Sequence, residues 1–431
     1  MTLTRNNFFA LTATLVAFVA AIALFRGLNG STAVVGSSDG GASVHARTTD
    51  QQVAALQAVV GSHPRDAGSL VLLGNAYLQK VRETGDAEYY TRSQGVLERA
   101  RSVNPRYSAV YTGLGTLAMA RHDFASGLAY GLEAHRLAPD VVQPLGVIVD
   151  AQVELGRYHD AGATLQRMID LKPNLASYAR VSYFRELHGD LGGAVRAMQL
   201  AVDAGGGARE NVAYVQSLLG DLEFTRGHLA AAAEAYRHAA FSFPGYAQAE
   251  VGLAKVDAAR YRFTPAIRGL REVVDRLPLP AYVVALGKTE QAAGRAADAR
   301  RDLELVRAEQ RLLAANGVNT DTELALYEAD HGSPARAVAL ARRAWASAPS
   351  VRSADALEWS LTSAGRAREA LPWSARALRL GSRDPMFLYH AGMTARTAGR
   401  TAQARTLLAR SLALNPRFSP LYAPRAERAL R

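Results

Sequence analysis

Residues 113–139 read GLGTLAMARHDFASGLAYGLEAHRLAP, and this stretch decides the fold. Gly115 lies in an apolar segment that a helix can bury, and Pro139, 24 residues later, cannot continue a helix. The polar residues 121–123 divide the stretch into two helical segments. Because one such helix pair cannot bury its apolar faces alone, the fold depends on whether the pattern recurs along the chain.

The pattern returns about every 34 residues, the period typical of a helical repeat. The spacing of 24 residues from a small residue to a proline recurs from Gly220 to Pro244 and from Ala254 to Pro278. Glycine stands in the turn between the two helices of a pair at seven places: Gly156, Gly189, Gly227, Gly294, Gly332, Gly365 and Gly399. We therefore predict about ten units, with a lone helix before the first unit and a capping helix after the last.

These residues resemble the tetratricopeptide-repeat (TPR) family from about residue 50 to the C-terminus. The resemblance implies an all-α protein, a right-handed superhelical solenoid of antiparallel helix pairs. A small residue at repeat position 8 is expected to face an alanine at position 20, which lets the two helices approach closely. Three glycines at Gly205–Gly207 replace a proline junction, so we predict a hinge between an N-terminal half, residues 49–204, and a C-terminal half, residues 208–431.

The uncharged run FFALTATLVAFVAAIALF covers residues 8–25. Its 18 residues would span about 27 Å as a helix, near the lower limit for crossing a bilayer. We predict a membrane anchor or signal segment at residues 1–28, followed by a Gly- and Ser-rich flexible linker at residues 29–48. The expected location is a single-pass membrane protein whose repeats are extracytoplasmic, or a secreted or periplasmic protein if the segment is cleaved.

Nothing in the sequence favours catalysis. The chain has no cysteine, so it contains neither a thiolate metal site nor a cysteine nucleophile. The pairs His122-Asp123 and His159-Asp160 fall in turns between helices, where capping accounts for both residue types. We therefore predict a protein that is not an enzyme, with no catalytic, cofactor-binding or metal-binding residues.

The predicted binding surface is the concave groove, towards which the first helix of each unit turns repeat positions 2, 5, 9 and 12. The polar and aromatic residues read out at these positions are Asn75, Gln143, Asp150, Tyr183, Glu186, Tyr214, Asp221, Lys255, Lys288, Trp359, Tyr389 and Arg396. A mixed surface of this kind suits a protein or peptide partner.

The C-terminal end concentrates positive charge. The whole chain has a net charge of +11, and eight arginines face one acid, Glu427, from Met386 onward. The predicted anion-binding residues are Arg400, Arg405 and Arg410, with a solvated cap as the alternative interpretation. Nucleic acid is not expected as a partner because no stacking set of aromatic residues accompanies the arginines.

The leading functional hypothesis is a membrane-tethered or exported scaffold for protein–protein interactions in an envelope, assembly or export system. Two alternatives stay open. One is a regulatory or substrate-recognition module that faces the cytoplasm, and the other is a binder of anionic surfaces through the arginine-rich end.

Overall fold

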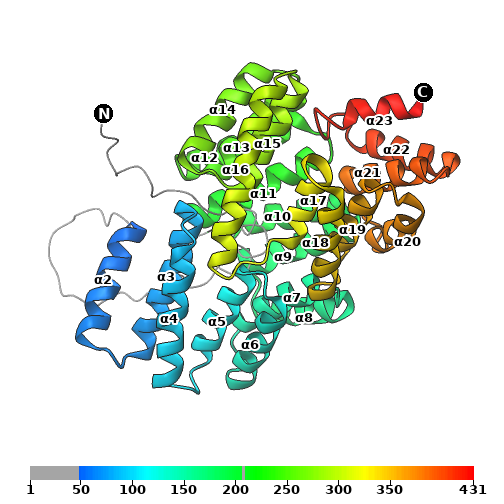
Figure 1. Ribbon diagram of the computed structural model, residues 1–431. Helices are drawn as coiled ribbons and strands as arrows, with labels where there is room; N and C mark the ends of the chain where they lie inside the picture. Colours follow the sequence, from blue (N-terminus) through cyan, green and yellow to red (C-terminus); the bar gives the residue numbers. More distant parts are fainter. Residues whose placement is uncertain (1–47, 206–208) are drawn as a thin grey trace, which may run out of the picture.

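The computed structural model describes residues 48–205 and 209–431, and this part of the chain is helical with no strand. Its helices, coloured along the sequence in Figure 1, are α2 (Thr49–Ser62), α3 (Ala67–Thr84), α4 (Glu88–Val103), α5 (Ser108–Ala120), α6 (Phe124–Leu137), α7 (Gln143–Glu154), α8 (Tyr158–Leu171), α9 (Leu175–Leu187), α10 (Leu191–Asp203), α11 (Arg209–Thr225), α12 (Leu229–Ser242), α13 (Ala247–Ala259), α14 (Phe263–Arg276), α15 (Pro280–Ala292), α16 (Ala296–Ala315), α17 (Asp321–His331), α18 (Pro334–Ser347), α19 (Val351–Ser363), α20 (Ala367–Ala377), α21 (Pro385–Thr397), α22 (Thr401–Leu414) and α23 (Ala423–Leu430).

The helices pack as ten consecutive pairs within the described residues, from α3 with α4 to α21 with α22. Each pair also packs on the next one, while α2 and α23 cover the two ends of the stack. The predicted all-α solenoid of antiparallel helix pairs is therefore confirmed, because neighbouring units bury one another's apolar faces.

The small residue at repeat position 8 makes room for a large side chain sixteen residues later. A Cβ atom added to Gly220 would lie 2.5 Å from the ring of Tyr236, and one added to Gly287 would lie 2.6 Å from the side chain of Leu303. The facing residue expected from the repeat pattern was an alanine at position 20. The nearest atoms belong instead to position 24, so the repeat pairs a small residue with a large one.

Position 8 of one unit holds Glu358 in place of a small residue. Its carboxylate is fully buried and accepts a hydrogen bond from the hydroxyl of Ser374, the residue sixteen positions later. In this unit the large side chain is therefore on the first helix and the small one on the second, which is the reverse of the arrangement in the other units. Burial raises the pKa of Glu358 to about 8, and the nearby Asp355 carboxylate acts in the same direction.

Most turns between paired helices adopt the left-handed conformation that favours glycine. Six of the seven predicted turn glycines have φ between 69° and 80°, and Gly332 is the exception. His122 and Tyr261 take this conformation without being glycine, at φ of 57° and 59°. A non-glycine residue is strained there, so the side chain should have a compensating contact.

Both strained side chains contact a distant part of the chain. Nδ1 of His122 lies 2.7 Å from the carbonyl oxygen of Asn319, and the guanidinium of Arg417 lies 5.6 Å from the centre of the Tyr261 ring. Similar contacts join the Val351 amide to the Tyr158 hydroxyl at 2.8 Å. We call this line of contacts the seam.

The seam shows that the superhelix closes on itself. The side-chain amide of Asn415 donates a hydrogen bond to the carbonyl of Phe224 across 191 residues, and His122 lies 197 residues from Asn319. Each separation corresponds to about six units of 34 residues, so about six units make one superhelical turn. In Figure 1, α17 to α19 accordingly lie beside α7 to α10.

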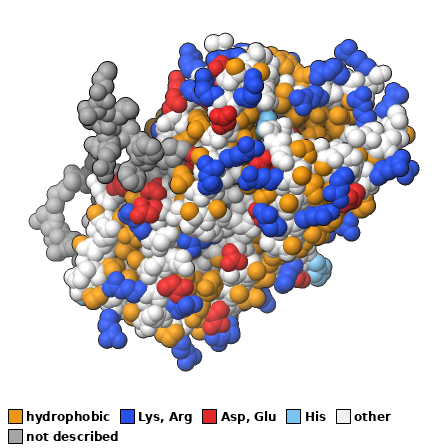
Figure 2. Space-filling model, viewed as in Figure 1, with side chains coloured by type: hydrophobic (Ala, Val, Ile, Leu, Met, Phe, Trp, Pro, Cys, Tyr) orange, Lys and Arg blue, Asp and Glu red, His pale blue; other side chains and the backbone are white. Residues whose placement is uncertain are grey.

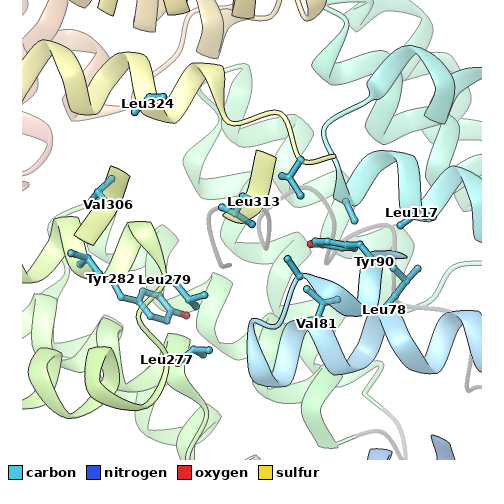
Figure 3. Close-up of a cluster of buried hydrophobic side chains, with 14 of the residues drawn as sticks. Leu78, Val81, Tyr90, Leu117, Leu277, Leu279, Tyr282, Val306, Leu313 and Leu324 are labelled. Atoms are coloured by element: carbon cyan, nitrogen blue, oxygen red, sulfur yellow. The ribbon is translucent and has the colours of Figure 1, made fainter. Parts of the chain in front are cut away.

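The hydrophobic core crosses the seam as well. One cluster of buried side chains joins residues of α3 to α5, such as Leu78 and Tyr90, with residues of α14 to α17, such as Tyr282 and Leu324. Figure 3 shows Leu313, near the end of α16, between these two groups. The seam is thus an apolar interface with hydrogen bonds at its turns.

One prediction is corrected by this architecture. In the part of the chain that the structure describes, no helix combines the length and the apolar character needed to cross a membrane. This finding overturns the predicted single-pass membrane location. Residues 8–25 and the rest of the predicted anchor and linker up to residue 47 lie outside the described residues, as do Gly206 and Gly207 of the predicted hinge.

Candidate functional site

Closure of the superhelix converts the inner face of the solenoid into a cavity of about 490 Å³. First helices from several units line it, namely α9, α15, α17, α19 and α21. Of the residues predicted for the groove, Tyr183, Glu186 and Lys288 lie at this cavity. Cavities of about 300–1,000 Å³ are the usual size of ligand sites, so this is the candidate functional site.

The wall of the cavity is mainly apolar. Its larger apolar side chains are Leu187, Leu191, Val284, Leu326, Met386 and Phe387. Val284, Leu326, Met386 and Phe387 keep part of their surface exposed, although each lies on the inner face of the fold. Partly exposed apolar side chains that gather in one hollow favour burial by a ligand.

Lys288 is held in place at the cavity by a buried acid. Its Nζ lies 2.9 Å from Oδ2 of Asp330, whose other oxygen accepts a hydrogen bond from Nε1 of Trp359 at 2.8 Å. Burial alone would lower the pKa of Lys288, but the facing carboxylate outweighs it and raises this pKa above its ordinary value. The Lys288 ammonium is therefore already neutralised within the fold.

His390 forms a second charge pair at the cavity. Its Nδ1 lies 2.9 Å from Oδ1 of Asp355, and its ring stacks on Trp359 with centroids 4.3 Å apart. Burial acts to lower the pKa of His390, and the Asp355 carboxylate outweighs burial and raises it. Trp359, predicted for the groove, is thus a buried support of the cavity wall.

Other predicted groove residues are buried between neighbouring helices. Arg180 forms a double hydrogen bond with the Asp150 carboxylate at 2.7 and 2.9 Å, and both side chains are buried. Tyr214 and Tyr389 are buried as well. These residues stabilise the packing of adjacent first helices, and so they are not available to a partner.

The remaining groove residues lie away from the cavity. Asn75, Gln143 and Asp221 are half-buried, and Asp221 accepts a hydrogen bond from the Tyr236 hydroxyl at 2.7 Å. Lys255 and Arg396 are exposed. The structure therefore brings only part of the predicted set together.

Several cavity residues were not predicted, although the repeat register indicates them. Arg352 and Met386 occupy position 2 of their units, Asp355 occupies position 5, and Leu326 occupies position 9. The repeat register was thus a sufficient signal for them. Asp384 precedes its helix in a loop between units, where the register gives no signal.

The predicted anion-binding arginines Arg400, Arg405 and Arg410 are exposed on or next to α22. Arg410 also lines an open cleft at the seam, of about 580 Å³, together with Arg226, Arg383 and His228. Arg226 and His228 each pair with Glu223. Figure 2 shows basic side chains across the whole visible face as well as over the C-terminal helices.

Among the described residues, no group of three or more His, Cys, Asp or Glu side chains is arranged to hold a metal ion. The turn residues Asp123 and Asp190 accept hydrogen bonds from the first turns of α6 and α10. They act as helix caps.

No protein-family model matches the sequence, and no curated protein matches it. Among solved structures, the human IFIT1 dimer with PPP-AAAA is 14% identical with a TM-score of 0.45, covering 86% of this chain and 91% of that one. The APC/C hetero-tetramer Cut9-Hcn1 is 15% identical with a TM-score of 0.39, covering 89% and 84%. YrrB, described as a TPR protein with an unusual peptide-binding site, is 16% identical with a TM-score of 0.29, covering 42% and 92%.

These neighbours are helical-repeat proteins of the TPR type. At such TM-scores the likeness carries no argument about function. The assignment of a TPR-like solenoid rests on the ten helix pairs and their repeat register.

Proposed function

We propose that this chain is a binding scaffold that receives a segment of a protein partner in the cavity inside its closed superhelix. The observation that carries the proposal is the hollow of about 490 Å³ with partly exposed apolar side chains on the first helices of several units. A stack of repeats presents its inner helices to one continuous partner, so an extended segment can contact many units at once. Lys288 and His390 are each paired with an acid of the fold, so both help to hold the cavity wall in place.

Site-specific photo-cross-linking tests this proposal. Phe387 lines the cavity, whereas Phe241 on α12 is 84% exposed outside it, so the same benzophenone amino acid can replace either residue. We expect a covalent adduct with a partner protein from position 387 and none from position 241. Filling the cavity by Val284→Trp should abolish the adduct. Equal adducts at both positions, or an adduct that survives the filled cavity, would show that the partner binds elsewhere.

A second candidate function is anion binding in the seam cleft. Arg383 and Arg410 converge there from different units, and both are exposed. We expect pyrophosphate, measured by calorimetry at low salt, to bind more weakly after Arg383→Gln with Arg410→Gln, and to bind equally after Arg405→Gln. An unchanged affinity in the double variant would remove this candidate.

A further inference from the structure

The cavity has an acidic side as well as an apolar wall. Its carboxyl groups are Glu186, Glu323, Asp330, Asp355 and Asp384, and its basic groups are Lys288, Arg352 and His390. Negative groups therefore exceed positive ones, which disfavours phosphate- or carboxylate-bearing ligands.

Most of these carboxylates have a partner within the fold. Asp330 is paired with Lys288, and Asp355 with His390. Asp384 caps α21, because its Oδ1 accepts hydrogen bonds from the amides of the first turn. These three acids are therefore occupied by the protein itself.

Glu186 differs from them. Within the described residues, no Lys, Arg or His lies within ion-pair distance of its carboxylate, although it sits half-buried at the end of α9 on the cavity wall. The charged groups that face it are Asp384 and Asp221, which repel a second negative charge, and Arg352, which attracts it. Tyr183 lies on the same helix. Glu186 is thus an acid at the cavity without a cation of its own.

We propose that the cavity recognises a basic apolar segment, in which the head group of a Lys or Arg side chain pairs with Glu186 and adjacent large apolar side chains cover Leu326, Met386 and Phe387. This inference rests on the proposed function, since the same cavity receives the segment. Charge complementarity selects the basic residue, and the apolar wall selects its neighbours.

The protonation of Glu186 gives the pairing a measurable signature. Burial is the main cause that raises the pKa of Glu186 to about 8, and the carboxylates of Asp384 and Asp221 add to it. At pH 7 the empty cavity therefore holds a proton on Glu186. A cation that pairs with the carboxylate must lower this pKa, so binding releases the proton.

Three blocked peptides that differ only in their middle residue test the inference by binding to the full-length protein. They are acetyl-Leu-Lys-Phe-amide, acetyl-Leu-Gln-Phe-amide and acetyl-Leu-Glu-Phe-amide. We expect the Lys peptide to bind at least about tenfold more tightly than the Glu peptide in calorimetry. Glu186→Gln should weaken the Lys peptide by about fivefold or more and leave the Gln peptide within about twofold. Glu234→Gln, at an exposed acid on α12, is the matched control and should change neither affinity.

Calorimetry at pH 7 in two buffers of different ionisation enthalpy measures the number of protons released when the peptide binds. The wild type should release a proton with the Lys peptide, and the Glu186→Gln variant should release none. Equal affinities for the three peptides, no binding of any peptide, or proton release that persists in the variant would overturn the inference. If the Phe387 cross-link persists in that case, the proposed function stands and only the charge preference is wrong.

Discussion

Tyr236 lies between two glycines, and its ring fills the space that a side chain at either position would need. A Cβ atom at Gly220 would lie 2.5 Å from the ring, and one at Gly252 would lie 2.4 Å from it. We expect Gly220→Leu to lower the free energy of unfolding by about 1–3 kcal/mol, because the added side chain overpacks the core. Gly95→Leu is the control, since a Cβ atom there meets nothing within 4 Å. Chemical denaturation compares the two, and equal losses would refute the repeat register.

Glu309 on α16 is fully buried, and neither of its carboxylate oxygens has a hydrogen-bond partner. Burial raises its pKa from 4.5 to about 7. The folded state therefore holds a proton that the unfolded state loses between these values, so the free energy of unfolding falls as pH rises from 4.5 to 7 and stays low above pH 7. We expect Glu309→Gln to remove about 2–3 kcal/mol of this fall. Urea denaturation of the wild type and the variant at pH 5 and pH 8 measures this fall. If the free energy of unfolding changes equally with pH in both proteins, Glu309 is ionised in the fold.

The repeat register predicted residues well where the repeat alone determines their place. It placed Tyr183, Glu186 and Lys288 on the inner face, and they line the cavity. It could not distinguish them from Asp150 or Tyr214, which occupy equivalent positions but are buried by neighbouring side chains. Whether the residue at one position is buried depends on the side chains of the next unit. The repeat register describes one unit at a time, so it cannot predict this burial.

At the scale of elements, the seam makes a prediction that an open solenoid does not. The Val351 amide donates its hydrogen bond to the Tyr158 hydroxyl, and both groups are buried. Tyr158→Phe leaves this amide without an acceptor, so we expect the free energy of unfolding to fall by about 1–3 kcal/mol. Amide hydrogen exchange at residues 349–353 should also become faster.

The matched control is Tyr111→Phe. The Tyr111 hydroxyl donates to the carbonyl of Pro105 only six residues away, at an exposed site. Its removal should leave residues 349–353 as protected as before. If both variants behave alike, the bond between Tyr158 and Val351 has no role in holding the seam.

Helix pairs were predictable from the sequence because their signals are local: a small residue, a turn glycine and a closing proline recur within one unit. The seam was not predictable, since its contacts join residues 156–197 positions apart. Its contacts also use ordinary turn residues. Asn319 lies in a loop and Asn415 caps the end of α22, and only the superhelical pitch places them against His122 and Phe224.

At the scale of the whole molecule, closure of the superhelix encloses an internal cavity. An open solenoid has only contacts between neighbouring units, so its stability is close to a sum of local terms. The seam adds long-range contacts, and one hydrophobic cluster runs from α3 to α20 across it. The cavity exists because units far apart in the sequence face each other, which links the proposed function directly to closure.

Closure is the central claim, and intramolecular cross-linking tests it most directly. The hydroxyl of Thr91 lies 3.3 Å from Oδ1 of Asn316, 225 residues away, and the natural chain has no cysteine, so Thr91→Cys with Asn316→Cys introduces the only two thiols. Thr91→Cys with Arg428→Cys is the control, because α4 at the lower left and α23 at the upper right lie at opposite ends of the molecule in Figure 1. A short bismaleimide should join the first pair within one chain at high yield and leave the second pair unlinked. Failure to join Thr91→Cys to Asn316→Cys, in a variant whose circular dichroism shows an intact helical fold, would mean that the superhelix is open.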